Sequence, residues 1–196
     1  AAMGRFGMAN QLGPMFALDD LRAAHAHGHE IGCHTFSHRD CARAAAPAIA
    51  AEIADNTAAL SRALGGAAVT DFAYPFGGVS QAAKHALAGR FVSCRGTGRG
   101  LNRGTADLAD LASTSLYSRD FDRDRLCRLI EDAQAEGAWL IFYTHDVADD
   151  PSPFGCTPAQ FHSIVAYAAE NATVLPVRDV LAGLGLAGAA TPRRAA

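Results

Sequence analysis

The stretch GHEIGCHTFSH, residues 28–38, decides how the rest of the sequence is interpreted. Residues 30–33 are typical of a short strand, and two imidazole side chains, His34 and His38, follow it. On a helical turn their spacing would put both rings on one face, close enough to share a metal ion. Two histidines alone make a weak metal site, so a third ligand, usually a carboxylate, is needed. Spacing alone favours the alternative of two unrelated histidines in a polar loop.

Two further polar clusters begin where a predicted strand ends. Residues 75–77 follow the predicted strand 71–74, and His145 follows the predicted strand 139–143. The carboxyl ends of parallel strands line the active site in α/β folds, so the three clusters could converge on one pocket. His145 taken alone fits two roles equally well, a general acid or base and a hydrogen-bonded residue at a strand end.

Around these clusters, helix and strand patterns alternate along the chain. Helices are predicted at residues 18–26, 47–64, 80–88, 122–136, 157–170 and 177–184. Strands are predicted at residues 30–33, 71–74, 90–94, 111–117, 139–143 and 173–175, and 139–143 has the clearest pattern of a buried strand. This order implies an α/β fold with a parallel sheet covered by helices. A closed barrel and an open doubly wound sheet both fit it.

The composition is that of one globular domain. The chain has 196 residues, of which 49% are apolar and 19% are charged. We predict a single domain over residues 1–187 and a loose Ala/Gly-rich tail over residues 188–196. The net charge of -3 gives no electrostatic reason to expect nucleic acid or an anionic membrane as a partner. No run of about 18 apolar residues occurs, so no membrane span is expected.

The cysteines indicate neither a zinc ribbon nor a disulfide framework. There are five, an odd number, and none form a CxxC pair. Free buried thiols are the favoured interpretation. Together with the lack of a signal-peptide pattern at the first residues, they slightly favour the cytoplasm over secretion.

Three motifs resemble those of the NodB-homology polysaccharide deacetylases, carbohydrate esterase family 4. Residues 28–38 are similar to the family's H-[ST]-x-x-H metal motif with its G-H-E-I-G lead-in. The sequence FAYPFG at residues 72–77 resembles the F-R-x-P-Y-G motif. Residues 140–146 resemble the family's late strand ending in His-Asp. The order and the rough spacing agree, and the resemblance extends over residues 17–180.

The resemblance implies a fold, a reaction and a set of site residues. The fold would be a distorted (β/α) barrel, and the reaction would remove an N-acetyl group from an amino-sugar-containing saccharide or lipid-linked sugar. His34 and His38 would bind a divalent metal, often zinc, which activates water and polarises the acetamide carbonyl. The backbone N–H of Phe76 would help to hold the oxyanion, and His145 would protonate the leaving amine. Tyr74 and Pro75 would contact the substrate.

The sequence also departs from the family pattern. The T-F-D-D motif, which supplies the catalytic base and the third metal ligand, is absent. Asp19 and Asp20 are interpreted as acids in the first turn of a helix and not as its substitute. Ala73 stands where many members have an arginine that orients the base. Trp139 is interpreted as a core residue, and no counterpart of the Asp/Trp motif of the acetyl pocket stands out.

These departures lead to an expectation and an alternative. We expect an incomplete barrel lacking its first strand, with that place open or filled by residues 1–16. We also expect the 196-residue chain to bind zinc poorly and to show little or no deacetylase activity, since one ligand and the base are missing. The alternative is an inactive protein of the same fold that binds sugar or metal without turnover.

Overall fold

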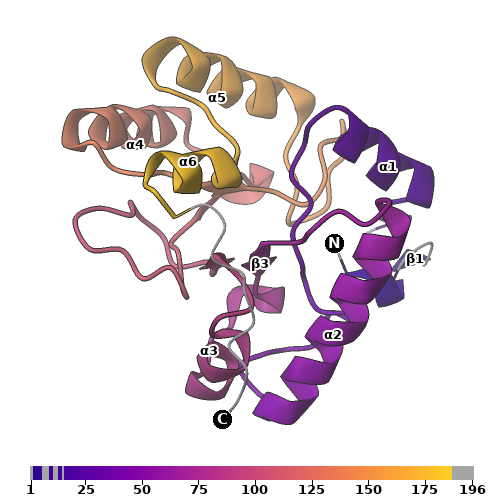
Figure 1. The fold of residues 1–196 in the computed structure, drawn as a ribbon. Helices are drawn as coiled ribbons and strands as arrows, with labels where there is room; N and C mark the ends of the chain where they lie inside the picture. The colour runs from indigo at the N-terminus through magenta and orange to yellow at the C-terminus, as the bar shows by residue number, and fades with distance from the viewer. Residues whose placement is uncertain (1, 6–8, 11–12, 15, 187–196) are drawn as a thin grey trace. The chain divides into compact units, whose positions relative to one another are not determined.

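The computed structural model describes residues 2–5, 9–10, 13–14 and 16–186 (Figure 1). The predicted loose tail at residues 188–196 lies outside them. The described residues have a mixed α/β fold, as predicted, with six α-helices and short strands. The chain forms two compact units. The first unit comprises Ala1–Gly96, Leu108–Asp110 and Pro176–Ala196, and the second comprises Thr97–Asp107 and Leu111–Leu175.

Parallel backbone pairing forms the centre of the first unit. Strands β3 (Asp71–Ala73) and β4 (Ser93–Arg95) pair in parallel, with Ala73 opposite Arg95. On the other side of β3, Cys33 forms a parallel bridge with Phe72. The predicted strand 30–33 is therefore reduced to this bridge, and the predicted strand 90–94 is shifted towards the carboxyl end. The three segments run in one direction, as the alternation of helices and strands predicts.

Four helices of the first unit lie where the sequence predicts them. They are α1 (Leu18–Ala26), α2 (Ala46–Ala63), α3 (Gln81–Leu87) and α6 (Val177–Gly183). Helix α2 has Pro47 in its first turn and is followed by Gly65 at φ 66°, a conformation that ends helices. Asp19 and Asp20 lie in the first turn of α1, and the Asp20 carboxylate accepts the Ala17 N–H at 2.8 Å. Their interpretation as helix-start acids is confirmed.

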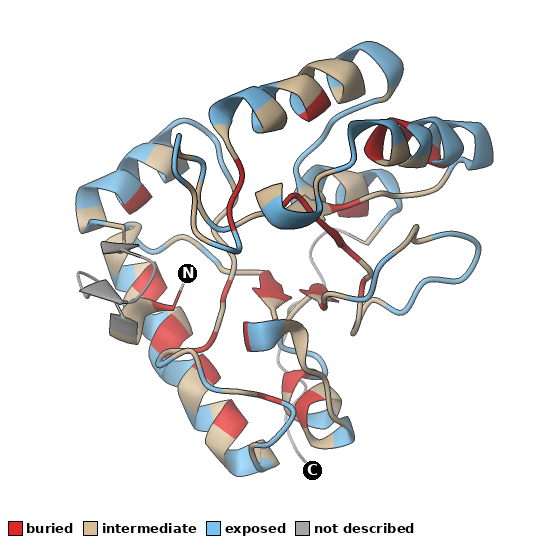
Figure 2. Cartoon of the chain, turned by 180° about the vertical axis from the view of Figure 1, so that it is seen from behind, coloured by how far each residue is buried: buried red, intermediate tan, exposed pale blue. Residues whose placement is uncertain are grey.

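The core of the first unit lies between α2, α3 and the paired strands. Figure 2 shows these helices buried on one face and exposed on the other, which is the pattern that apolar periodicity predicts. The buried residues of this core are Cys33, Cys41, Ile49, Ile53, Phe72, Tyr74, Ala83, Leu87 and Cys94. All five cysteines of the chain are free and buried, which confirms the expectation of buried thiols. Short elements at the start of the chain are η1 (Met3–Arg5) and the antiparallel pair β1 (Ala9–Asn10) and β2 (Gly13–Pro14).

The second unit joins a short parallel strand pair to two helices. Strand β5 (Thr114–Ser115) pairs with β6 (Phe142–Tyr143). The short helix η3 (Ser118–Asp120) follows β5. Helices α4 (Arg123–Glu136) and α5 (Pro158–Asn171) match the predicted ranges. The side chains of Asp122 and Thr157 cap them, as expected of N-cap residues. Their buried faces meet in a core of Leu116, Leu126, Cys127, Ile130, Cys156 and Ile164.

Two strand predictions for the second unit were wrong in extent or in kind. The predicted strand 139–143 is shortened to β6, whose two residues are half-buried, and Trp139 instead pairs with Asn102 in an antiparallel bridge. Trp139 is therefore not a fully buried core residue. Residues 173–175 form no strand, and Val174 is 62% exposed. A strand-like pattern yields a strand only where a partner backbone is available, and that is a nonlocal condition.

No helix in the described ranges has both the length and the apolar character needed to cross a membrane.

We expect the packing of α2 to dominate the stability of the first unit. Leu60→Ala removes a side chain that is 0% exposed and should cost about 2–5 kcal/mol of the free energy of unfolding. Leu184→Ala makes the same chemical change at a side chain that is 62% exposed and should cost less than about 0.5 kcal/mol. Urea denaturation followed by circular dichroism measures both. Equal losses would contradict the burial that the structure gives to α2.

Candidate functional site

His34 and His38 lie in ring-to-ring contact in the first unit. Their ring centroids are 4.8 Å apart, with the ring planes at 69°. The segment that joins them is not the helical turn on which the argument from the spacing relied. Thr35 and His38 instead adopt positive φ angles of 56° and 62°, which fold the loop back on itself. The two imidazoles meet through this loop conformation.

His34 is held in the form that binds metals. Its Nδ1 lies 2.7 Å from the carbonyl oxygen of Ala73, so Nδ1 carries the proton and donates it. The lone pair of Nε2 is then available to a ligand, as in metal-binding histidines whose second nitrogen donates to a carbonyl. Burial lowers the pKa of His34 to about 3, against the opposing hydrogen bond to Ala73, and the nearby His38 lowers it further. The ring is therefore neutral at physiological pH.

The carboxylate of Glu52 on α2 fixes the loop that carries the pair. It accepts hydrogen bonds from the backbone N–H and the hydroxyl of Ser37, both at 2.7 Å, and from Arg39 Nε at 3.2 Å. Burial opposes the charged form of Glu52, but the Ser37 hydrogen bonds and Arg39 outweigh it and hold the pKa below its usual value of 4.5. The buried Thr35 hydroxyl also accepts the Arg39 N–H at 2.9 Å. Together these bonds support the strained loop.

The second polar cluster meets the first. Phe76 lies in the short helix η2 (Pro75–Gly77) with φ 59° and ψ 2°, and its ring packs edge-on against His38 with centroids 4.6 Å apart. The Phe76 side chain is 71% exposed. Pro75 and Tyr74 are buried, and the Tyr74 hydroxyl donates to Ala109 O at 2.9 Å. The roles of Phe76 in oxyanion binding and of Tyr74 and Pro75 in substrate binding stay predictions.

The described residues bring two histidines together without a third side chain of a metal-binding type. Among residues 2–5, 9–10, 13–14 and 16–186, no group of three His, Cys, Asp or Glu side chains is placed to hold a metal ion. The hydrogen bond of His34 to Ala73 O gives this ring a tautomer that could bind a divalent metal through Nε2. The structure places Arg95 on β4, opposite Ala73. A cation thus lies beside the position where the family has an arginine.

His145 belongs to the second unit and lies among aromatic side chains. Its backbone N–H and its Nδ1 both lie 3.2 Å from Phe154 O, which leaves Nε2 directed away from this carbonyl. The Tyr117 hydroxyl is 3.5 Å from Nδ1, and the rings of Tyr117 and Phe154 flank the imidazole at 5.9 and 5.7 Å. Sequence reasoning missed Tyr117 and Phe154, because no local pattern relates them to His145. The expected convergence of His145 with the other clusters stays a prediction.

Asp146, the next residue after His145, holds the loop that carries Phe154. Its carboxylate accepts the backbone N–H and the hydroxyl of Ser152 at 2.8 and 2.5 Å. The Ser152 hydroxyl bond, the largest cause, lowers the pKa of Asp146. Its backbone carbonyl accepts the Cys156 N–H at 3.0 Å. Asp146 therefore positions the backbone against which His145 is hydrogen-bonded.

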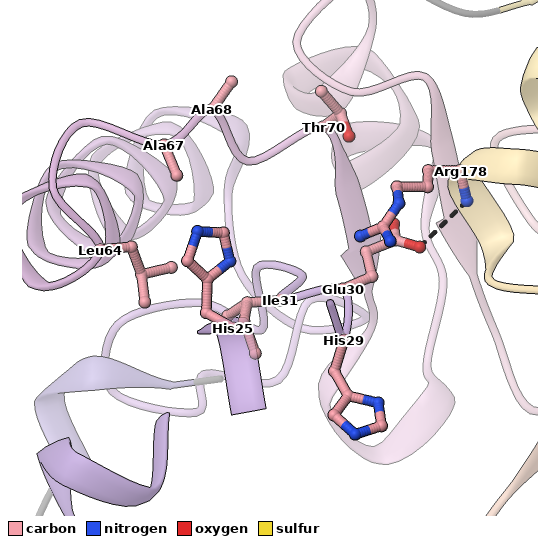
Figure 3. A pocket seen from close by; sticks show the side chains of 9 residues that line it. All are labelled: His25, His29, Glu30, Ile31, Leu64, Ala67, Ala68, Thr70 and Arg178. Carbon is pink, nitrogen blue, oxygen red and sulfur yellow. Dashed lines mark hydrogen bonds between the residues drawn. The ribbon is translucent and has the colours of Figure 1, made fainter. Parts of the chain in front are cut away.

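A second polar group lies at the opposite ends of the paired segments in the first unit, where a small cavity of about 80 Å³ opens (Figure 3). Glu30 lines it and accepts the backbone N–H of Arg178 on α6 at 3.0 Å. Burial and the neighbouring carboxyl of Asp71 raise the pKa of Glu30 to about 7. His25 and His29 also line the cavity. The hydrogen bond from Arg178 to Glu30, at the edge of this cavity, joins α6 to the strand ends.

Replacing Glu52 by a neutral side chain should destabilise the loop that carries His34 and His38. Glu52→Gln removes the charge that Ser37 and Arg39 bind, and we expect a loss of about 1–2 kcal/mol at pH 7. Because the folded-state pKa of Glu52 is depressed, this contribution is present above about pH 4.5 and is lost as the pH falls through the folded-state value. Urea denaturation at several pH values from 7 to 3 should therefore show that the difference in unfolding free energy between the wild type and Glu52→Gln decreases. Asp55→Asn, an exposed acid on the same helix, is the control, and a pH-independent difference would contradict the role given to Glu52.

A methyl group at residue 155 should displace the His145 loop. The Cβ of Gly155→Ala would lie 2.6 Å from the backbone oxygen of Asp146, a contact that requires the backbone to shift. We expect a loss of about 1–3 kcal/mol in unfolding free energy and changed NMR signals of the His145 ring. Gly183→Ala, where the Cβ meets no atom within 4 Å, is the matched control. Unchanged His145 signals in Gly155→Ala would refute the link between this loop and the imidazole.

Comparison with known proteins relates the His34 region to one family. Residues 8–89 match the family model of the polysaccharide deacetylases. The matched segment contains His34, His38 and Phe76, and it ends before His145. No curated protein sequence matches the chain.

One solved structure shows a similar fold, and a second is reported beside it. The Xyl-CE4 domain of a multidomain xylanase from the hindgut metagenome of Trinervitermes trinervoides aligns with a TM-score of 0.55 at 14% identity, over 86% of this chain and 71% of that one. A T48 deacetylase with substrate aligns with a TM-score of 0.49 at 17% identity, over 85% of this chain and 71% of that one. The family match and the fold shared with the Xyl-CE4 domain support the expected relationship: residues 8–89 are similar to the polysaccharide deacetylase family.

Proposed function

We propose that the chain is a metal-dependent hydrolase that removes N-acetyl groups from an amino-sugar-containing saccharide or a lipid-linked sugar. One observation carries the proposal: His34 and His38 are in ring contact within the segment that matches the polysaccharide deacetylases. The Ala73 carbonyl holds the His34 proton on Nδ1, so that Nε2 presents a lone pair. A buried neutral imidazole with an oriented lone pair suits metal binding better than a role in packing alone.

The proposed architecture is the distorted, incomplete (β/α) barrel of this family. Two parallel pairs, β3 with β4 and β5 with β6, support it, because a barrel of this type is built from parallel strands. Helix α3 connects β3 to β4, as in a strand–helix–strand repeat. The fold likeness to the Xyl-CE4 domain also supports it.

In this proposal each site residue has a defined task. His34 and His38 hold a divalent metal, most simply zinc, which supplies Lewis-acid activation of water and of the acetamide carbonyl. The left-handed turn at Phe76 directs its backbone N–H towards the oxyanion, and its ring, at 4.6 Å from His38, keeps this turn beside the pair. His145 donates a proton from Nε2 to the leaving amine while Phe154 O holds Nδ1. Tyr74 and Pro75 support the substrate-binding surface from beneath.

The alternative function is that of a deacetylase-fold protein that binds a saccharide or a metal without turnover. The incomplete ligand set favours it, since no carboxylate joins His34 and His38 among the described residues. Two imidazoles alone bind zinc weakly and leave the base unassigned. The partner in both proposals is a saccharide, and the expectation of no nucleic-acid partner stays a prediction.

We expect the 196-residue chain to bind zinc weakly and to release acetate slowly from an N-acetylated oligosaccharide in excess zinc. His34→Ala and His38→Ala should each remove a ligand, reduce zinc affinity by about 10-fold or more and abolish acetate release above background. Zinc binding is measured by calorimetry and acetate by a coupled assay, each with and without a chelator. His85→Ala, an exposed histidine on α3, is the matched control and should change neither.

The two functions give different outcomes. Zinc-dependent acetate release that requires both His34 and His38 supports the hydrolase. Saccharide binding with no acetate release at any zinc concentration would overturn the hydrolase and support the binding protein. Tight stoichiometric zinc binding with rapid turnover would contradict the expectation of a weak two-histidine site.

A further inference from the structure

Arg119 lies over two aromatic rings in the second unit. Its guanidinium carbon is 5.1 Å from the ring centroid of Tyr117 and 5.0 Å from that of Phe154. Both distances are within the range of a cation–π contact. Arg119 itself is exposed to solvent, whereas Tyr117 is buried at 7% exposure. The rings therefore limit the conformations of the guanidinium and leave its N–H donors in contact with solvent.

The charge of Arg119 is not neutralised by a neighbouring acid. Within the described ranges, no carboxylate forms an ion pair with it. The adjacent Asp120 instead pairs with Arg99 at 3.0 Å, and Asp146 is occupied by Ser152. Two other arginines of the second unit, Arg99 and Arg103, do have acidic partners. Arg119 thus combines a fixed position with an uncompensated positive charge.

Arg119 and His145 share the same two aromatic side chains. The rings of Tyr117 and Phe154, which lie under the guanidinium, also flank the His145 imidazole at 5.9 and 5.7 Å. Phe154 is 38% exposed, so part of its ring can receive the apolar face of a sugar. The Asp146–Ser152 bonds fix the loop on which Phe154 lies. A ligand at His145 is therefore bound next to a cation.

We propose that Arg119 binds an anionic group, a carboxylate or a phosphate, on the saccharide that occupies the surface around His145. The identification of the ligand as a saccharide rests on the proposed function. The planar fork of a guanidinium matches both anions through two parallel hydrogen bonds, which gives geometric selectivity as well as attraction. An acidic saccharide would supply a carboxylate, and a lipid-linked sugar would supply a phosphate. Arg119 is then a specificity-determining residue of this chain.

The test compares three N-acetylated probes on the whole 196-residue protein. They are N-acetylglucosamine, which is neutral, N-acetylglucosaminuronic acid and N-acetylglucosamine 1-phosphate. NMR titration of the Arg119 side-chain N–H and of the His145 ring gives a Kd for each. At low salt, at least one anionic probe should bind about 5–10-fold more tightly than the neutral sugar, and added salt should weaken that preference. The anion that binds more tightly distinguishes a carboxylate source from a phosphate source.

Variants separate the role of Arg119 from general charge effects. Arg119→Gln should reduce the affinity for the anionic probes to that for the neutral sugar and leave the neutral Kd unchanged. Arg119→Lys keeps the charge without the planar fork and should retain only part of the preference. Arg123→Gln is the matched control, since Arg123 lies over a single ring, Tyr167, at 5.6 Å. Thermal unfolding of each variant checks that the fold is intact.

The outcomes distinguish this inference from the proposed function. Equal binding of all three probes, no binding of either anionic probe, or a preference that survives Arg119→Gln would overturn the role of Arg119. If acetate is never released but the preference for an anion depends on Arg119, the inference holds for a binding protein and the hydrolase fails. If acetate is released without any preference, the hydrolase holds and the inference fails.

Discussion

The parallel pairing of Cys33 with β3 is the constraint from which the geometry around His34 follows. Cys33 N–H donates to Asp71 O at 2.8 Å, and Cys33 O accepts the Ala73 N–H at 2.9 Å. The next residue, His34, is thereby placed where its Nδ1 meets the Ala73 carbonyl at 2.7 Å. Gly32 permits this close approach, since a Cβ there would lie 3.1 Å from Asp71 O. The register in which Cys33 pairs with β3 thus sets the tautomer of His34 and the distance of His34 from η2.

Sequence reasoning located the helices well and the strands poorly. The start of α2 is encoded by Pro47 and its end by Gly65, and α5 begins at the Thr157 cap. These signals act over a few residues and can be recognised without knowledge of the fold. A strand depends on a partner that is distant in sequence, so the pattern at residues 173–175 gave no strand. The same dependence shortened the predicted strand 139–143 to two residues.

The proximity of His34 and His38 agrees with the argument from their spacing, but a different backbone conformation produces it. The argument from the spacing relied on a helical turn, whereas the loop uses left-handed φ angles at Thr35 and His38. Such angles are unfavourable for side chains other than glycine and require compensation from the surroundings. The carboxylate of Glu52 provides it through Ser37 and Arg39. Neither the strain nor the distant carboxylate could be inferred from residues 34–38 alone.

In the proposed metal site, the direction of the strands restricts where a third ligand can lie. Glu30 and Asp71 form the acidic group of the first unit, but both precede the bridge at Cys33 and Phe72, whereas His34 and Phe76 follow it. Extended chain rises about 3.3 Å per residue, so the Cα atoms of Glu30 and His34 are separated by roughly 10–13 Å. Moreover, Glu30 is engaged with Arg178, and Asp71 accepts the hydroxyls of Thr70 and Ser93. These acids serve the packing of α6 and the strand ends, so neither of them is placed to complete the proposed site at His34 and His38.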